Sequence, residues 1–358
     1  MVKIEENSKC SIINLTHSLD PKTGGVLEAV RLIEDEIISR SFKSELSANQ
    51  KKEYPSRSIF IAHGLWQWPG VIAYKNWRTK NRPYLVFPHG MMDPWFKRNY
   101  PLKHVKKQLY WWWRQGKILR NAHAVCFTTE EERQLAKKTF WPYQCREVVT
   151  GLGVADPPGD EHNQKNIFKE SFPQTKNKKV LLYMGRIHPK KGLGLLLNAF
   201  IRQKRKDDLL VIAAPIPEKN PYYQKLRKQA QAIQKQVIWT GMLEGDLKWG
   251  ALRSADSLIL PSHQENYGMV VAEACSVGTP VLLSNKVNLY HEILEDDAGL
   301  VEKDTQEGID NLLGHWLSGR VQSKSENARR CFQENLHISK TTDRLIELIR
   351  EAAHPNSI

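Results

Sequence analysis

The chain has 358 residues, of which 41% are hydrophobic and 26% are charged. These are values of a globular protein, and the length is enough for two ordinary domains. The first ten residues carry acidic side chains and no apolar run, and no later stretch is long enough to span a bilayer, so we expect neither a signal peptide nor a membrane helix. The formal net charge of +14 calls for an anionic partner, for which nucleoside diphosphates, lipid headgroups and nucleic acid all qualify.

The five cysteines are scattered through the chain and form no C-x-x-C pair. This pattern favours reduced thiols in a cytoplasmic protein and argues against a zinc site.

The chain begins with a pattern of alternating strands and helices. Residues 11–15 read as a short buried strand, the loop that follows ends in Gly24 and Gly25, and 26–38 is an amphipathic helix. Glycines between a strand and a helix either serve the turn alone or leave amides free to face a phosphate. Residues 41–58 are polar and show no clear strand.

A histidine follows one of the next two strands. These strands are expected at 58–62 and 84–87, with a helix starting near Pro69 between them. His89 comes directly after the second strand, where a side chain can hydrogen-bond a ligand or serve only the local structure. Asp93 is either an acceptor contact or the cap of the next turn.

Residues 94–129 contain no acidic residue, and their lysines and arginines alternate with tryptophans and tyrosines. Over 95–120 this pattern suits the headgroup region of an anionic membrane. A buried tryptophan cluster beneath a solvated cationic face explains it equally well. No nucleic-acid-binding motif accompanies these residues, so we expect no nucleic acid partner.

The expected first domain is residues 1–155, with its last strands at 123–128 and 147–149. Glycines, prolines and polar residues then follow, and 156–176 is expected to be a linker. A second domain is expected over 177–338, and a last helix over 339–358.

The second domain opens with a strand at 179–184, a polar loop, and a helix at 192–200. The loop contains Arg186 and Lys191, so two cations and a helix N-terminus converge on one place, which suits a diphosphate. The spacing is not that of a P-loop ATPase. Further strands are expected at 209–213 and 237–240.

Residues 260–280 contain two glutamates separated by seven residues, on either side of the start of a helix. Glu265 lies in a loop after the strand 257–260, and Glu273 lies about two turns into the helix. Gly268 precedes the helix, where the lack of a side chain lets a ligand approach the backbone. The glutamates are expected to face different parts of an elongated ligand, because carboxylates accept hydrogen bonds from vicinal hydroxyls. Alternatively, Glu265 interacts with the helix dipole and Glu273 is a solvated surface charge.

The segments 181–200, 237–248, 260–280 and 288–301, together with 18–25 and 88–95, resemble the motifs of one enzyme family. The family is that of the retaining GT-B glycosyltransferases, family 4, also described as glycosyl transferases group 1, with its E-x7-E pair. The resemblance extends over about the whole chain. Family members usually carry a strand where 41–58 shows none, so the first domain is expected to be abbreviated. The resemblance implies an α/β fold of two Rossmann-like parallel-sheet domains that face each other across a cleft, with the C-terminal helix crossing back to the first domain.

The resemblance also implies roles for particular residues in binding a nucleotide-diphosphate sugar. Glu265 and His89 would contact the donor sugar, and Glu273 the ribose. Arg186 and Lys191 would neutralise the diphosphate. The remaining donor-side residues implied by the motifs are Gly24, Gly25, Met242, Asn266, Gly268, Met269 and Val270.

The expected activity is transfer of a sugar to an acceptor hydroxyl with retention of configuration, in the synthesis of surface polysaccharide or glycolipid. No Asp-x-Asp occurs in the chain, so we expect a metal-independent enzyme without a cofactor. The acceptor would be a glycan or a lipid-linked sugar, and the protein would be cytoplasmic, at the inner face of the membrane. The alternatives are a GT-B epimerase or phosphorylase, and a non-catalytic relative that binds membrane or RNA.

Overall fold

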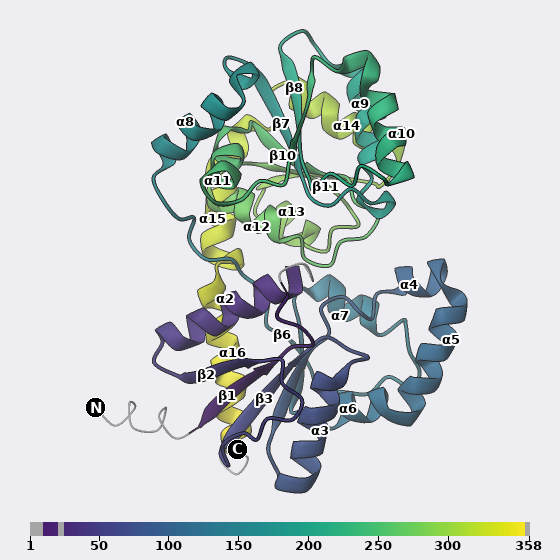
Figure 1. Cartoon of the computed structure of the whole chain (residues 1–358), viewed down its shortest axis with the longest axis vertical. Helices are drawn as coiled ribbons and strands as arrows, with labels where there is room; N and C mark the ends of the chain where they lie inside the picture. Colours follow the sequence, from purple (N-terminus) through teal and green to yellow (C-terminus); the bar gives the residue numbers. More distant parts are fainter. Residues whose placement is uncertain (1–9, 21–24, 355–358) are drawn as a thin grey trace. The chain divides into compact units, whose positions relative to one another are not determined.

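The computed structural model describes residues 10–20 and 25–354, and the predicted donor residue Gly24 lies outside them. These residues form two compact units (Figure 1). Unit 1 consists of the described residues up to Ala155 and from His337 onward, and unit 2 is Asp156–Leu336. The segment 156–176, expected to be a linker, contains a helix of unit 2, α8 (Glu161–Ser171).

Within the described residues, unit 1 contains one six-stranded parallel sheet in the order β2-β1-β3-β4-β5-β6. Its strands are β1 (Ser11–Leu15), β2 (Lys43–Ser47), β3 (Ser58–His63), β4 (Tyr84–Phe87), β5 (Ala124–Phe127) and β6 (Glu147–Val149). The helices are α2 (Gly25–Ser39), α3 (Trp68–Lys80), α4 (Pro94–Asn99), α5 (Pro101–Tyr110), α6 (Gly116–Arg120), α7 (Glu130–Ala136) and α16 (Ile338–Ala353), with a π-helical turn, η2 (Trp111–Gln115).

The sheet of unit 2 is also parallel and six-stranded within the described part of the chain, in the order β12-β11-β10-β7-β8-β9. Its strands are β7 (Lys179–Met184), β8 (Asp208–Ala213), β9 (Val237–Gly241), β10 (Ser257–Leu260), β11 (Val281–Ser284) and β12 (Gly299–Glu302). Besides α8, the α-helices are α9 (Leu193–Gln203), α10 (Pro221–Gln229), α11 (Gly245–Ser254), α12 (Met269–Ser276), α13 (Tyr290–Glu295), α14 (Gln306–Leu317) and α15 (Ser325–Cys331). Short helical turns are η3 (Pro173–Thr175), η4 (Pro189–Lys191), η5 (Ala230–Ile233), η6 (Gln322–Lys324) and η7 (Phe332–Leu336).

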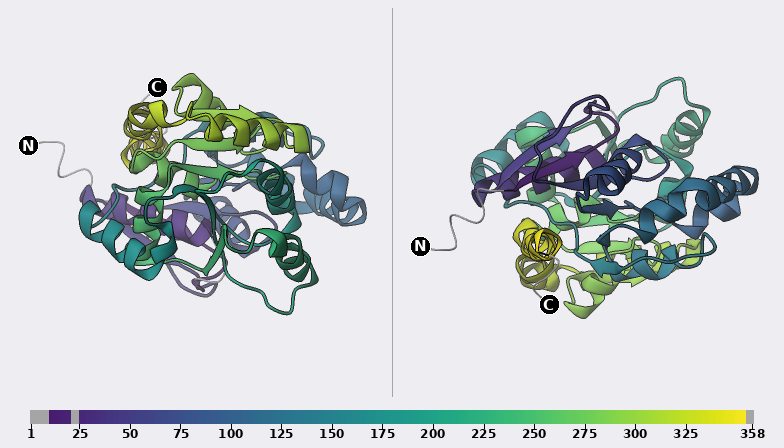
Figure 2. Two further views of the ribbon diagram at one scale, coloured as in Figure 1. Left: turned by 90° about the horizontal axis from the view of Figure 1, so that it is seen from above. Right: turned by 90° about the horizontal axis from the view of Figure 1, so that it is seen from below.

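Helices lie on both faces of each sheet, as the end-on views show (Figure 2). Central strands such as β1, β4 and β10 are therefore buried along their whole length. This explains why they read as continuous apolar runs in the sequence instead of alternating patterns. The expected doubly wound α/β fold is confirmed for both units.

The prediction that residues 41–58 contain no strand is wrong, because β2 occupies Lys43–Ser47 and pairs in parallel with β1. β2 lies at the edge of the sheet, and Ser47 is its only buried residue. An edge strand with few buried side chains has no need of apolar residues, so its hydrophobic pattern is too weak to recognise. Unit 1 is therefore less abbreviated than the sequence suggested.

The last helix, α16, belongs to unit 1 and packs against α2. Arg40, just after α2, forms an ion pair with Asp343 and donates a hydrogen bond to the Ser339 carbonyl at 3.0 Å. Gly153 lies so close to the start of α16 that a β-carbon there would be 2.4 Å from the Ile338 nitrogen. The prediction that the chain returns to the first domain at its C-terminal helix is confirmed.

Candidate active site

Two loops meet at the carboxyl edge of the sheet of unit 2. One follows β7 and contains η4, and the other follows β10; these strands are hydrogen-bonded neighbours. The His263 amide donates to the Lys190 carbonyl at 2.7 Å, and Lys190 Nζ donates to Gln264 Oε1 at 3.0 Å. The carboxyl edge of a parallel sheet is where α/β folds bind ligands, so these two loops define the candidate site.

Gly192 makes the close approach of the two loops possible. Its φ of +68° is in the left-handed region, and a β-carbon at this position would lie 1.9 Å from the carbonyl oxygen of Pro261. A side chain would therefore push the loop after β7 away from the loop after β10. The position of Lys191, the preceding residue, depends on this contact.

The ammonium of Lys191 forms an ion pair with the carboxylate of Glu265. The two side chains are only 10% and 18% exposed. Burial lowers the pKa of Lys191 to about 7, and the positive charges of Lys190 and Arg186 act in the same direction. The contact with Glu265 opposes this shift, because a neighbouring carboxylate favours the charged ammonium. Lys191 is thus a cation whose charge depends on what occupies the site.

The backbone of Glu265 is fixed by a third loop, the one after β11. The Glu265 amide donates to the Lys286 carbonyl at 2.9 Å, and the Asn288 amide donates to the Glu265 carbonyl at 3.1 Å. Ser284, at the end of β11, donates a hydrogen bond to the carbonyl of Ser262. Bonds on both sides of Glu265 leave its backbone little freedom, so the carboxylate is held in a defined place.

Gly268 is the N-cap of α12 and has a φ of +76°. Its left-handed backbone turns the chain from the loop of Glu265 into the helix, which is the conformation that favours glycine. The amides of Met269 and Val270 stand in the first turn of α12, which leaves them outside the hydrogen-bond ladder of the helix. Such a helix N-terminus attracts anions.

Glu273 is 6% exposed and forms an ion pair at 2.6 Å with Lys248, which lies on α11. Its interpretation as a solvated surface charge is therefore wrong. Lys248 was not among the predicted site residues, although it ends the motif segment 237–248. The position of Lys248, a cation in a segment already assigned to the donor side, could have indicated this residue. Only the fold shows that α11 brings Lys248 next to Glu273 of α12.

Three further predicted donor residues, Arg186, Met242 and Asn266, follow strands of the same sheet. Arg186 is exposed and lies in the same loop as Lys191. Met242 is 64% exposed and follows Gly241 at the end of β9. Asn266 is partly buried next to Glu265 in the chain.

Unit 1 places three of the predicted residues at the carboxyl side of its own sheet. His89 follows β4 with a φ of +50°, an uncommon conformation for a residue with a side chain. Its Nε2 lies 3.0 Å from Nδ1 of His63, a buried residue that the sequence analysis did not single out. Asp93 accepts a hydrogen bond from the Trp95 amide at 2.7 Å and is the N-cap of α4. Gly25 is the first residue of α2.

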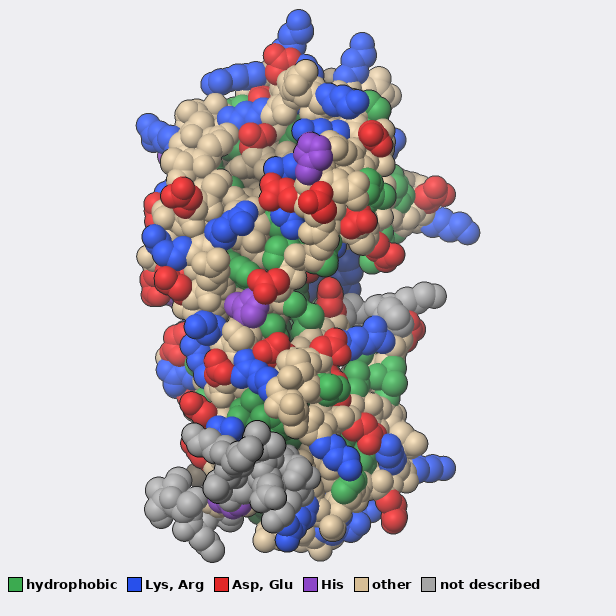
Figure 3. Space-filling model, turned by 90° about the vertical axis from the view of Figure 1, so that its left-hand side faces the viewer, with side chains coloured by type: hydrophobic (Ala, Val, Ile, Leu, Met, Phe, Trp, Pro, Cys, Tyr) green, Lys and Arg blue, Asp and Glu red, His purple; other side chains and the backbone are tan. Residues whose placement is uncertain are grey.

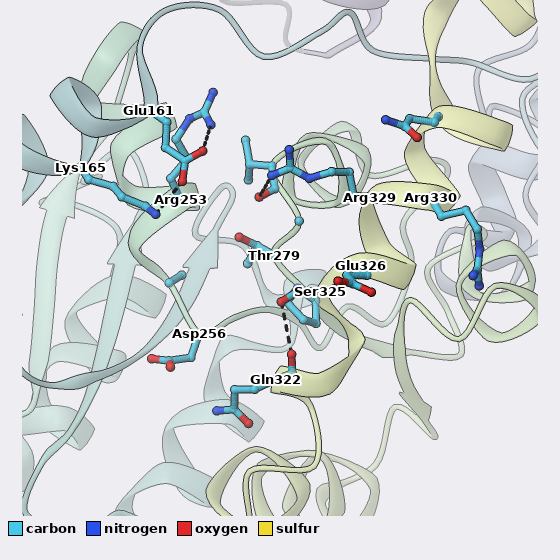
Figure 4. A pocket seen from close by; sticks show the side chains of 15 residues that line it. Glu161, Lys165, Arg253, Asp256, Thr279, Gln322, Ser325, Glu326, Arg329 and Arg330 are labelled. Carbon is cyan, nitrogen blue, oxygen red and sulfur yellow. Dashed lines mark hydrogen bonds and ion pairs between the residues drawn. The ribbon is translucent and has the colours of Figure 1, made fainter.

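A pocket of about 570 Å³ lies at the opposite edge of the sheet of unit 2 (Figure 4). Asp256 and Pro280, which line it, immediately precede β10 and β11. Its cations are held by the protein itself, because Glu161 pairs with Arg253 at 3.1 Å and with Lys165 at 2.7 Å. This pocket contains none of the predicted site residues.

Both halves of the chain are similar to known glycosyltransferases. Residues 164–335 match the family model of glycosyl transferases group 1, and residues 53–150 match that of the glycosyl transferase 4-like domain. The processive diacylglycerol alpha-glucosyltransferase of Acholeplasma laidlawii is 26% identical over 83% of this chain and 90% of its own length. The lipopolysaccharide 1,2-N-acetylglucosaminetransferase of Salmonella typhimurium is 31% identical over 45% of this chain and 45% of its own. For four curated relatives, the matched part covers 38–45% of the relative.

The fold resembles that of the Anabaena protein HepE in complex with UDP and glucose, with a TM-score of 0.73 over 95% of this chain and 99% of the other, at 14% sequence identity. The protein therefore has the GT-B fold. The part of the chain that matches the glycosyl transferases group 1, residues 164–335, contains both ion pairs.

Proposed function

We propose that the protein transfers a glycosyl group from a nucleotide-diphosphate sugar to an acceptor hydroxyl. The observation that carries the proposal is the pair of Lys191 and Glu265 at the carboxyl edge of the sheet, next to the N-terminus of α12. An ammonium can bind a phosphate and a carboxylate can accept hydrogen bonds from hydroxyls, so the pair supports a site for a phosphate-linked sugar. The match to the glycosyl transferases group 1 and the names of the relatives support the same activity.

The diphosphate of the donor would be bound by positive groups of the protein. Lys191, Arg186 and the amides of Met269 and Val270 would neutralise the charge that develops on the leaving diphosphate. The chain contains no Asp-x-Asp to hold a divalent metal, which supports a metal-independent reaction. We therefore expect the protein to keep its transferase activity in excess chelator.

The sugar and the nucleoside would be bound by carboxylates. We assign Glu265 to hydroxyls of the donor sugar and Glu273 to the ribose, because the two lie at opposite ends of the segment 265–273. The exposed Met242, beside Gly241 at the end of β9, would lie on the side of the base. His89 would contact the donor sugar, and Gly24 and Gly25 the diphosphate.

We further propose that the anomeric configuration is retained. The departing phosphate oxygen would guide the acceptor to the same face of the sugar, so that Glu265 need not form a covalent bond. ¹H NMR of the first product, before any mutarotation, reads this outcome directly from the anomeric coupling constant.

The acceptor would be at an anionic membrane surface, reached by α5. This helix has no buried residue, and Leu102, Val105 and Leu109 form a stripe along it that is 82%, 57% and 57% exposed. Trp112 and Trp113 continue the exposed apolar surface, whereas the neighbouring Trp111 is buried. Lysines of α5 flank the stripe, and residues 94–129 carry no acid. Apolar and basic groups together are what an anionic lipid surface binds.

The other side of unit 1 differs. The face seen in Figure 3 mixes acidic side chains with lysines and arginines. Within the described residues, every helix is too short or too polar to cross a bilayer. On the basis of the apolar and basic surface of α5, we propose a cytoplasmic protein that acts peripherally on the inner face of the membrane. The similarity to a diacylglycerol glucosyltransferase and to a lipopolysaccharide N-acetylglucosaminetransferase supports this placement.

Activity with a panel of nucleotide sugars and lipid-linked acceptors tests the proposal. We expect nucleoside diphosphate to be released only when donor and acceptor are both present, in buffer with chelator. Interconversion of the nucleotide sugar without an acceptor would identify an epimerase. Dependence on inorganic phosphate as the acceptor would identify a phosphorylase.

A further inference from the structure

Unit 1 contains a buried chain of polar side chains that ends at His89. From Glu34 of α2 it runs through Asn14 of β1 to His63, the last residue of β3, and then to His89 (elements in Figure 1). Asn14 is fully buried, His63 is 2% exposed and Glu34 is 7% exposed. A buried polar network of this kind is retained only if each member has a partner, so the identity of donors and acceptors along it can be worked out.

The direction of the chain is set at its inner end. The amide nitrogen of Asn14 donates to the Glu34 carboxylate and to Ser44 Oγ at 3.2 Å, and the Ser44 hydroxyl donates to Glu34 at 2.7 Å. Burial raises the pKa of Glu34, and the hydrogen bonds from Ser44 and Asn14 oppose this rise because they favour the charged form. As a carboxylate, Glu34 can only accept hydrogen bonds. The amide nitrogen of Asn14 must therefore face Glu34, which turns the amide oxygen towards His63.

The same logic continues through the two histidines. Nε2 of His63 is 3.1 Å from the amide oxygen of Asn14, an acceptor, so this nitrogen carries the proton. In a neutral imidazole the other nitrogen is then an acceptor, and Nδ1 of His63 faces Nε2 of His89 at 3.0 Å. His89 must accordingly donate from Nε2, which leaves its Nδ1 without a proton.

We propose that Glu34, Asn14 and His63 are positioning residues that lock His89 in the tautomer protonated on Nε2, so that Nδ1 is presented as a hydrogen-bond acceptor. Burial lowers the pKa of His89 to about 4 and that of His63 well below its usual range, so both rings are neutral at pH 7. The left-handed backbone of His89 fits this account, because strained residues often lie at functional sites.

The consequence for the reaction rests on the proposed function. If His89 contacts the donor sugar, its Nδ1 accepts a hydrogen bond from a sugar hydroxyl and cannot donate to a phosphate oxygen. The residue then selects for a hydroxyl donor at that point of the substrate. The tautomer itself is a property of the unliganded protein and does not depend on the identity of the substrate.

Long-range ¹H–¹⁵N correlation on the full chain labelled with ¹⁵N-histidine tests the proposal at pH 7 without ligand. His89→Gln assigns the resonances of His89 by their loss. We expect the wild-type ring to show a protonated, pyrrole-type Nε2 and an unprotonated, pyridine-type Nδ1. A proton on Nδ1, or a ring averaged between the two tautomers, overturns the proposal.

Two matched variants test whether Glu34 sets the direction of the hydrogen bonds along the chain to His89. Glu34→Gln keeps the size of the side chain but adds a donor that lets the Asn14 amide turn over, so we expect the proton of His89 to move at least partly to Nδ1. Asp35→Asn, at the exposed neighbour in α2, changes the charge equally and should leave the tautomer unchanged. An unchanged His89 spectrum in a folded Glu34→Gln variant would contradict the role of Glu34.

Kinetics separates this role from the proposed transferase activity. We expect Glu34→Gln to lower kcat/KM for the donor by about tenfold, the effect of one hydrogen bond, and Asp35→Asn to leave it as in wild type. A tautomer shift without a change in kcat/KM would show that the chain positions His89 but that His89 does not contact the donor. That result would overturn the reaction role and leave glycosyl transfer itself intact.

Discussion

The two sheets differ in how charged groups beside their carboxyl edges are held. In unit 2 carboxylates are paired with lysines, Glu265 with Lys191 and Glu273 with Lys248. In unit 1 the buried carboxylate Glu132 accepts hydrogen bonds from the backbone amides of Gly90 and Thr128, and the neighbouring rings of His63 and His89 are neutral. Burying unpaired charge is costly, so each ion pair exists either to stabilise the fold or to be exchanged for a ligand. Under the proposed function, the ion pairs of unit 2 would supply affinity for a charged donor, whereas the histidines of unit 1 would supply a fixed hydrogen-bonding direction.

Removing Lys191 from its ion pair with Glu265 should have the largest effect on turnover. We expect Lys191→Ala to reduce kcat by roughly 10²–10³-fold, because one group that neutralises the leaving diphosphate is lost. Steady-state kinetics of nucleoside diphosphate release measures it. Lys206→Ala, an exposed lysine outside the site, is the control for general loss of charge. Turnover of Lys191→Ala equal to that of the control would remove the proposed role.

Separating the two loops should destabilise the protein without touching a charged group. In Gly192→Ala the new methyl group would clash with the Pro261 carbonyl and the φ of +68° would become strained, so we expect the free energy of unfolding to fall by roughly 3 kcal/mol. Gly245→Ala has a comparable φ of +52° but nothing within 4 Å, and should lose only about 1 kcal/mol. Urea denaturation compares them. Equal losses would show that the loop contact is not tight.

Changing Glu273, the partner of Lys248, should affect binding of the donor more than turnover. In Glu273→Gln we expect the KM for the donor to rise about tenfold with kcat nearly unchanged, because a charged acceptor for the ribose is replaced by a neutral amide. Steady-state kinetics with varied donor concentration measures the split. A fall in kcat at constant KM would place Glu273 at the reacting centre instead.

Changing the pH should sharpen the contrast between the ion pairs and the neutral histidines. The pKa of Lys191 is lowered to about 7, so its charged form is lost as the pH rises through this value, and binding of UDP, used as a diphosphate probe, should weaken several-fold between pH 6 and pH 9. Lys191→Arg, which stays charged, should bind with little pH dependence over this range. Isothermal titration calorimetry measures both profiles. Parallel profiles would exclude Lys191 as the titrating group.

Reversing charges on the exposed surface of α5 should have the smallest effect on the reaction in solution. Replacing Lys103 and Lys106 by glutamate should reduce co-sedimentation with vesicles that contain phosphatidylglycerol, because each basic residue contributes about 1 kcal/mol at an anionic surface. The same change at Lys225 and Lys228, exposed on α10 of unit 2, is the matched control. Equal binding of both variants would argue against α5 as the contact surface.

Most of the fold could be predicted because buried parallel strands are apolar along their whole length and the helices between them are amphipathic. The edge strand β2 could not, since little of it is buried. In the site, motif spacing indicated Lys191 and Glu265, and the structure shows that they touch. Motif spacing did not indicate Lys248 or His63. Their partners are distant in the sequence, and only the order of the strands makes them neighbours.

Calorimetric binding of nucleoside diphosphates and nucleotide sugars to wild type, Lys191→Ala and Glu265→Gln tests the central claim most directly. If Lys191 holds the diphosphate and Glu265 the sugar, Lys191→Ala loses affinity for both kinds of ligand. Glu265→Gln should keep the affinity for the nucleoside diphosphate and lose only the additional affinity that the sugar provides. Wild-type affinities for both ligands in both variants would contradict the assignment of the donor site to this ion pair.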